Sequence, residues 1–235
     1  MEREEIKEII KKEPWQIMRE EKSIENILEK FGALWKFPNR PSEPHAWLTP
    51  VFHGDSYVNL DFILSFPNLR KLISAMLGAM IEIKIKGNLK QEIDMIVSSS
   101  NSALLGEALS GSIGAIFAST EKVNQVQKWT KAFEIPASTR ILQVEDVVST
   151  LKTAKEVKKA VLEKNPQVEF IKDKDGNTII ASVVFFRSEI RLSGYRVFAL
   201  REMKSHLWLS ENCPLCKKGS PALEPKKNWK RFIEF

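Results

Sequence analysis

Cysteine is nearly absent from this 235-residue chain, because Cys213 and Cys216 are the only two. Two thiols so close in sequence exclude a scaffold held together by disulfides, and they favour a cytoplasmic location. Long apolar runs are also missing, since the longest, "LISAMLGAMI", is about half of the ~20 residues that span a bilayer. The N-terminal stretch "MEREEIKEIIKKEP" is too charged for a secretory signal peptide. We therefore expect a cytoplasmic protein without a membrane segment.

The bulk composition is that of a folded domain. Apolar residues make up 43% of the chain and charged residues 28%, enough for one sizeable domain with a short annex or for two small domains. A net charge of +6 favours anionic partners, either nucleic acid or phosphorylated metabolites. Basic residues are spread out except for Lys226, Lys227, Lys230 and Arg231. A solvated basic surface is therefore favoured over a nucleic-acid interface.

The apolar spacing divides the chain into an N-terminal helical segment and a larger α/β region. Residues 2–31 have helical periodicity that Pro14 interrupts, and a proline-rich loop follows over 36–47. We place the first segment at 1–40 and the main domain at 41–235, with a C-terminal tail over 205–235 that contains both cysteines.

Short apolar strands alternate with amphipathic helices after residue 90. Strands are predicted over 94–100, 115–119, 140–148, 178–186 and 195–202, and helices over 103–114 and 153–165. This alternation predicts an α/β fold with a mainly parallel sheet flanked by helices. Ligands of such folds bind beyond the carboxyl ends of the strands. That rim should hold Ser98–Ser102, Glu145–Thr153 and a polar segment over 118–133, which is either a mobile loop or a hairpin.

Two adjacent acids mark the end of one predicted strand. Glu145 and Asp146 are placed to hold ribose hydroxyls or a hydrated Mg²⁺. Ser149, Thr150 and Thr153 follow, and hydroxyls at a helix N-terminus suit a phosphate. From these residues alone, an ordinary strand end followed by a helix N-cap remains the alternative.

The surrounding sequence resembles the orotate branch of the type I phosphoribosyltransferases. Five segments resemble family motifs in the family's order. They are the N-terminal base-binding segment "LTPVFHGDSYVNLDFIL", the diphosphate loop "DMIVSSSNSALLGEAL", the mobile catalytic loop "TEKVNQVQKWTKAFEI", the phosphoribosyl-pyrophosphate motif "RILQVEDVVSTLKT" and the tail "ENCPLCKKGSPALEP".

This resemblance implies the type I phosphoribosyltransferase fold, with a small hood built from N-terminal and C-terminal segments. It also implies an enzyme of pyrimidine nucleotide biosynthesis. In that reaction, orotate or a related pyrimidine base displaces pyrophosphate from Mg²⁺-bound phosphoribosyl pyrophosphate. The mobile loop of such enzymes usually serves the neighbouring subunit's site, so a homodimer is expected.

The resemblance also assigns site residues. Glu145 and Asp146 would face the ribose hydroxyls. The remaining assignments are Ser149, Thr150, Lys152 and Thr153 for the 5′-phosphate, Lys122, Lys128 and Lys131 as loop cations for the diphosphate, Ser98 and Ser102 in the diphosphate loop, and His53 and Tyr57 in the base-binding segment.

Three ligand loops depart from the family pattern. Leu151-Lys152 replaces a Gly-Gly pair, Ser98 and Ser102 replace glycines, and Pro50-Val51-Phe52 replaces Ser-Gly-Lys/Arg. A non-glycine residue in the left-handed region costs roughly 1–2 kcal/mol, and the Leu151 side chain is expected to block the phosphate. The alternative function is therefore a non-catalytic protein that keeps the fold as a ligand sensor or assembly component.

The cysteine pair and the other histidines are expected to be structural. A four-ligand zinc site needs two ligands beyond Cys213 and Cys216, which His206 or a second copy of the chain would have to supply. We expect a plain structural turn there and no metal ligands. His45 should be structural, while His53 is as well suited to a structural role as to a base. Trp129 is an unusual residue for a mobile polar loop.

Overall fold

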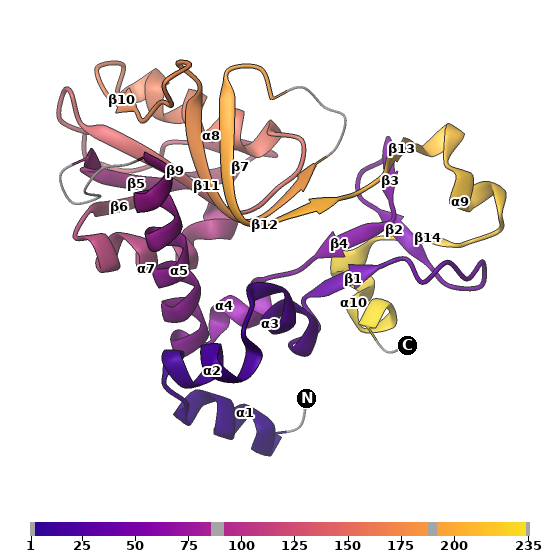
Figure 1. Ribbon diagram of the computed structural model, residues 1–235. Helices are drawn as coiled ribbons and strands as arrows, with labels where there is room; N and C mark the ends of the chain where they lie inside the picture. Colours follow the sequence, from indigo (N-terminus) through magenta and orange to yellow (C-terminus); the bar gives the residue numbers. More distant parts are fainter. Residues whose placement is uncertain (1–2, 86–91, 188–191, 234–235) are drawn as a thin grey trace.

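The computed structural model describes residues 3–85, 92–187 and 192–233 (Figure 1). Its centre is a six-stranded sheet in the order β12-β11-β9-β5-β6, with β10 beside β9, and all these pairings are parallel. The strands are β5 (Met95–Ser98), β6 (Ile116–Ser119), β9 (Arg140–Val148), β10 (Glu169–Phe170), β11 (Thr178–Arg187) and β12 (Tyr195–Lys204). The predicted parallel sheet is confirmed, and β9 lies at its middle.

Helices cover both faces of this sheet. The helices α5 (Pro67–Ile85) and α7 (Ala103–Ile113) pack on one face, and α8 (Lys152–Lys164) packs on the other (Figure 1). Successive strand residues point to opposite faces. Accordingly, Ile96 and Leu142 join the core beneath α5 and α7, while Met95 and Ile141 pack with residues of α8. Burial on both faces explains why these strands are continuous apolar runs.

The N-terminal region folds onto the same core. It contains α1 (Arg3–Lys11), α2 (Pro14–Glu21) and α3 (Ile24–Lys30), so the helical stretch is interrupted after Lys11 and Pro14 begins the second helix. Residue 2 of the predicted helical stretch lies outside the described residues. Within the described part of the chain, no helix combines the length and apolar character needed to cross a bilayer.

A small hood stands beside the main sheet (Figure 1). Its four-stranded sheet has the order β13-β3-β2-β14, and β1 pairs with β4 alongside. Segments from the two ends of the sequence therefore form one unit, as predicted. Its elements are β1 (Leu34–Lys36), β2 (His45–Trp47), β3 (Phe52–Gly54), β4 (Ser56–Val58), β13 (Leu207–Leu209), the 3-10 helix η2 (Ser210–Asn212), α9 (Pro214–Lys217), β14 (Ala222–Leu223) and α10 (Pro225–Ile233). The short helix α4 (Asp61–Ser65) follows β4 and packs in the main core, where Ile63 and Leu64 are buried.

The polar segment that follows β6 is a hairpin, which resolves the two alternatives left by the sequence. Strands β7 (Glu121–Val123) and β8 (Val126–Lys128) pair antiparallel, and both turn residues, Asn124 and Gln125, have positive φ. Trp129 follows β8 with only 8% of its surface exposed and packs in the core cluster of α8. This packing explains why a large aromatic residue occurs in a polar segment.

Candidate functional site

The two acids lie where β9 reaches the rim of the sheet. Glu145 is 3% exposed, and Asp146 is half-buried. Both face the 3-10 helix η1 (Ser100–Ser102) that follows the neighbouring strand β5. Ser99 donates a hydrogen bond of 2.7 Å to Oε2 of Glu145. The order of the central strands thus brings together Ser99 and Glu145, which are 46 residues apart in the sequence, at the predicted rim.

Ser102 links the two carboxyl groups. Its Oγ lies 3.0 Å from Glu145 Oε2 and 2.9 Å from Asp146 Oδ1, and it accepts a bond of 2.9 Å from the Asp146 N–H. Because a hydroxyl has a single proton, Ser102 donates to one carboxyl oxygen at a time. Both contacts are satisfied if Glu145 is protonated. Its O–H then donates to Ser102 Oγ, and the Ser102 hydroxyl donates to the Asp146 carboxylate.

The electrostatics of the pair agree with that arrangement. Burial raises the pKa of Glu145 to about 7, against the lowering effect of hydrogen bonds from Ser99 and Gln143, and the neighbouring Asp146 raises it further. Burial also raises the pKa of Asp146. A carboxyl pair of this kind holds a proton near neutral pH, as groups at functional sites often do.

The turn after β9 keeps a glycine-like backbone although it contains no glycine. Leu151 has φ 60° and ψ 1°, in the left-handed region, and is the N-cap of α8. Its side chain is 3% exposed and packs with Val148, Ala154 and Ile180. The expectation that Leu151 blocks a phosphate is therefore wrong, because its side chain points into the core. No side chain caps the N-terminus of α8, so its first N–H groups are available to an anion.

A cavity of about 280 Å³ lies between this rim and the hood. Four of the predicted site residues line it: Asp146, Ser149, Thr150 and Tyr57. Burial raises the pKa of Tyr57 to about 12, so its hydroxyl stays protonated and can donate a hydrogen bond. These four residues offer a carboxyl group and three hydroxyls to a ligand, and Thr150 lies just before the N-terminus of α8.

Further polar residues that were not among the predicted site residues also line the cavity, and three of them come from separate helical segments. They are Asn101 of η1, Asp61 of α4 and Lys226 of α10. The Lys226 Nζ lies 3.9 Å from Asp61 and is the cation of this set. Lys226 belongs to the basic cluster noted in the sequence, but only the fold shows that the C-terminal helix reaches the rim.

The other predicted site residues lie away from this cavity. Ser98 is fully buried and donates to the backbone oxygen of Ser99. Lys152 and Thr153 are exposed on the first turn of α8. The remaining predicted residues lie on other elements, with Lys122 and Lys128 exposed on the β7–β8 hairpin, Lys131 paired with Glu121, and His53 buried in the hood beside Cys216.

Known proteins resemble this chain over most of its length. No family model matches it. The orotate phosphoribosyltransferase of Caldanaerobacter subterraneus is 27% identical over 210 residues, covering 88% of this chain and 97% of that protein. The orotate phosphoribosyltransferase of Thermoanaerobacter sp. is 27% identical over 203 residues, covering 86% of this chain and 96% of that protein.

A solved structure has the same architecture. The orotate phosphoribosyltransferase from Aeropyrum pernix superposes with a TM-score of 0.53 at 12% identity, covering 75% of this chain and 92% of that one. The resemblance predicted from five sequence motifs is confirmed. The chain is therefore a distant homologue of the orotate phosphoribosyltransferases and has the type I phosphoribosyltransferase fold.

Proposed function

We propose that the cavity binds phosphoribosyl pyrophosphate and that the chain transfers its phosphoribosyl group to orotate or a related pyrimidine base. The observation that carries this proposal is the conformation of Leu151. A leucine held at φ 60° costs roughly 1–2 kcal/mol, yet its side chain is turned away from the cavity. A loop that had lost its ligand would have no need of this costly backbone path, which leaves the N-terminus of α8 open.

The lining residues suit the parts of this substrate. Ser149, Thr150 and the first N–H groups of α8 would hold the 5′-phosphate, with Lys226 adding positive charge. Asp146 would accept hydrogen bonds from the ribose hydroxyls. Mg²⁺ would enter with the diphosphate of the substrate. The protein would then act mainly by positioning the reactants and by stabilising charge on the departing pyrophosphate.

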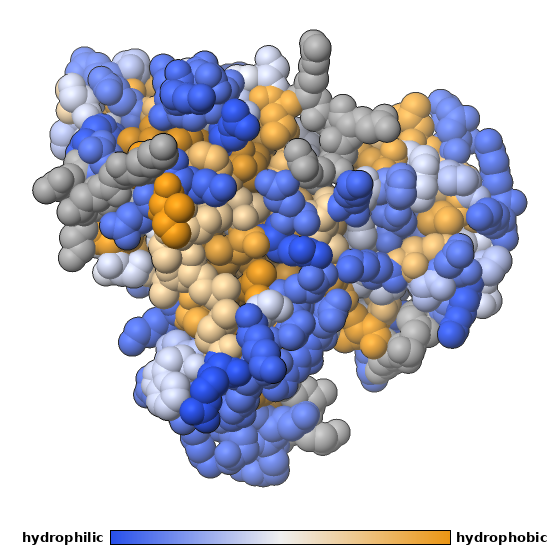
Figure 2. Space-filling view, in the orientation of Figure 1, coloured by the Kyte–Doolittle hydropathy of each residue, from blue (hydrophilic) through white to orange (hydrophobic). Residues whose placement is uncertain are grey.

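Loop cations for the pyrophosphate would come from a second subunit. Lys122 and Lys128 are exposed on the β7–β8 hairpin and do not line this chain's own cavity. The molecule also has apolar surface available for an interface. Leu104 of α7 is 48% exposed, Ile83 of α5 is 74% exposed, and Figure 2 shows apolar residues gathered over this side. We therefore propose a homodimer.

A second function rests on the contacts of Glu145. This carboxyl group is buried and bonded to Ser99, Ser102 and Gln143, so the apo site holds it within the protein. Serines at 98 and 102, which replace glycines of the family pattern, also give the diphosphate loop side chains where close approach of a phosphate needs bare backbone. The competing proposal is a non-catalytic protein that binds the phosphosugar as a sensor or an assembly component.

A turnover assay separates the two functions. The purified protein is given Mg²⁺, phosphoribosyl pyrophosphate and orotate, and formation of orotidine 5′-monophosphate is followed. The enzyme proposal predicts turnover that Asp146→Asn abolishes, while Glu134→Gln, a change at an exposed carboxyl group, leaves it intact. Substrate binding without turnover of orotate or other pyrimidine bases would favour the non-catalytic function.

A further inference from the structure

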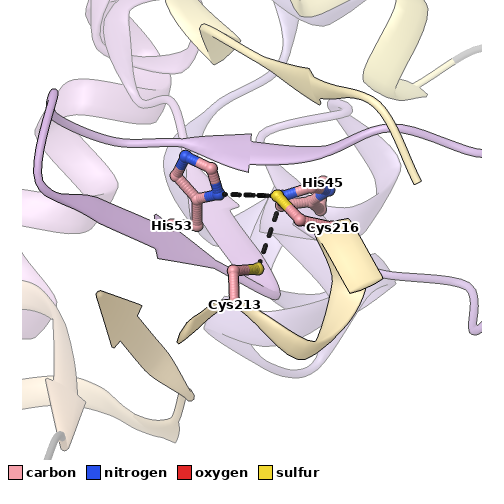
Figure 3. Close-up of side chains that lie close together, drawn as sticks. All are labelled: His45, His53, Cys213 and Cys216. Carbon is pink, nitrogen blue, oxygen red and sulfur yellow. Dashed lines mark hydrogen bonds between the residues drawn. The ribbon is translucent and has the colours of Figure 1, made fainter. Parts of the chain in front are cut away.

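Four side chains that could bind a metal converge in the hood (Figure 3). His45 on β2 and His53 on β3 lie on neighbouring antiparallel strands. Cys213 caps the N-terminus of α9, and Cys216 lies one turn later in that helix. Their ligand atoms all lie within 4.8 Å of one another, and His45, His53 and Cys213 are buried.

The spacing of these atoms fits a tetrahedral ion. His45 Nε2 lies 3.0 Å from His53 Nδ1, 3.5 Å from Cys213 Sγ and 3.4 Å from Cys216 Sγ, and Cys216 Sγ lies 3.3 Å from His53 Nδ1. Zinc bonds of about 2.3 Å to sulfur and about 2.0–2.1 Å to nitrogen give tetrahedral edges of roughly 3.3 Å between nitrogens and roughly 3.6 Å between nitrogen and sulfur. The observed distances differ from these edges by only a few tenths of an ångström.

A second layer of hydrogen bonds orients His45 for ligation. Ser220 Oγ donates a bond of 2.6 Å to the backbone oxygen of Glu43, so it accepts the 2.9 Å contact from His45 Nδ1. This places the ring proton on Nδ1 and leaves the Nε2 lone pair facing the cluster. A ligating histidine commonly donates its other N–H in this way.

From this geometry we infer that His45, His53, Cys213 and Cys216 form a structural zinc site. Two thiolates and two imidazoles are a typical ligand set for tetrahedral zinc, and four protein ligands leave no open position for catalysis. The ion would join the β2–β3 strands to α9, more than 150 residues later in the chain. It would thereby fix the hood that forms one side of the cavity, where Phe52 is the neighbour of His53.

The test uses the whole chain and two metals. Protein purified without chelator is expected to contain about one zinc per chain by elemental analysis. Exchange of the zinc for Co²⁺ should give the absorption of a tetrahedral site with thiolate-to-cobalt charge transfer. The Cys213→Ser/Cys216→Ser double variant should lose both signals. His206→Gln, which changes the one other histidine, should keep them, because His206 bonds Asp55 outside the cluster.

A ligand-swap variant covers the case in which the double variant does not fold. His53→Cys keeps four ligands and adds a thiolate, so it should still bind Co²⁺ and show stronger charge transfer. The inference would be overturned if the wild-type protein takes up neither metal. It would also be overturned if Cys213 and Cys216 form a disulfide in protein purified under reducing buffer. Metal binding that survives the double cysteine variant would overturn it as well. These outcomes do not depend on whether the chain has transferase activity.

Discussion

The hydroxyl of Ser99 lies 2.7 Å from the carboxyl group of Glu145 and donates a hydrogen bond to it across the rim of the sheet. Both residues are almost fully buried, at 1% and 3% exposure. The contact ties the loop after β5 to the end of β9. Burial at this position raises the pKa of Glu145, although the hydrogen bond from Ser99 lowers it, so the protonated form of the acid is favoured. This has a measurable consequence for stability.

Glu145 should make the protein less stable as the pH rises. Its pKa is raised from 4.5 to about 7, so the folded state holds a proton that the unfolded state releases. The free energy of unfolding should therefore fall between about pH 4.5 and pH 7, by roughly 2–3 kcal/mol for this group. Glu145→Gln should remove that part of the pH dependence in denaturant titrations at pH 5 and pH 8. An equal pH dependence of the free energy of unfolding in wild type and Glu145→Gln would contradict this. As a control, Glu134→Gln changes an exposed carboxyl group and should leave the pH dependence unchanged.

Replacement of Leu151 by glycine should lower stability without improving ligand binding. Glycine would relieve roughly 1–2 kcal/mol of left-handed strain, but loss of a buried leucine side chain costs roughly 2–5 kcal/mol. We expect a net loss of roughly 1–3 kcal/mol in thermal or chemical unfolding. Because the side chain already points into the core, affinity for phosphoribosyl pyrophosphate should change less than about threefold. A large gain in affinity would show that Leu151 does obstruct the phosphate.

Lys226 should contribute to ligand binding, while its neighbour should not. Both lysines are exposed, but Lys226 lines the cavity near Asp61, whereas Lys227 pairs with Glu224 and is not among the lining residues. Loss of one charge-assisted contact to an anion costs roughly 1.5–3 kcal/mol, or about 10-fold to 150-fold in Kd. Lys226→Ala should weaken phosphoribosyl pyrophosphate binding by that factor, and Lys227→Ala should leave it unchanged. If both substitutions weaken binding equally, Lys226 contributes only to the general positive charge of the surface and makes no specific contact with the ligand.

The proposed homodimer should be visible in solution. Light scattering at micromolar concentration is expected to give about twice 26.9 kDa. Replacement of an exposed apolar residue on α7, as in Leu104→Glu, should shift the mass toward the monomer, while Glu107→Lys on the same helix serves as a charge control. A strict monomer in the wild type would remove the shared-site role proposed for Lys122 and Lys128.

Local patterns in the sequence were sufficient to predict the central sheet. Strand β9 and helix α8 follow from apolar runs and three- to four-residue spacing, which report burial directly. The pairing of Glu145 and Asp146 with the loop after β5 also followed, because parallel strands end at one rim. The conformation of Leu151 does not follow from local patterns, because only the packing of its side chain with Ile180 shows that this side chain points into the core.

The ligand cluster in the hood could not be predicted from local patterns in the sequence. His206 is nearest to the cysteines in sequence, so it was the natural candidate for a further ligand. The structure instead brings His45 and His53 to Cys213 and Cys216 through the pairing of β2 with β14 and of β3 with β13. These strand pairings join residues more than 150 positions apart in the sequence. The apolar pattern within the N-terminal or the C-terminal segment does not predict which strand pairs with which. The contribution of Lys226 to the cavity was missed for the same reason.

Binding of phosphoribosyl pyrophosphate in the cavity beside Leu151 is tested most directly by calorimetric titration of the wild-type chain. In the presence of Mg²⁺, we expect saturable binding of about one molecule per chain with a Kd on the order of micromolar. Binding should weaken in Lys226→Ala and persist in Leu151→Gly. Absence of any binding to the folded, metal-replete wild-type protein would contradict the proposed function of the cavity.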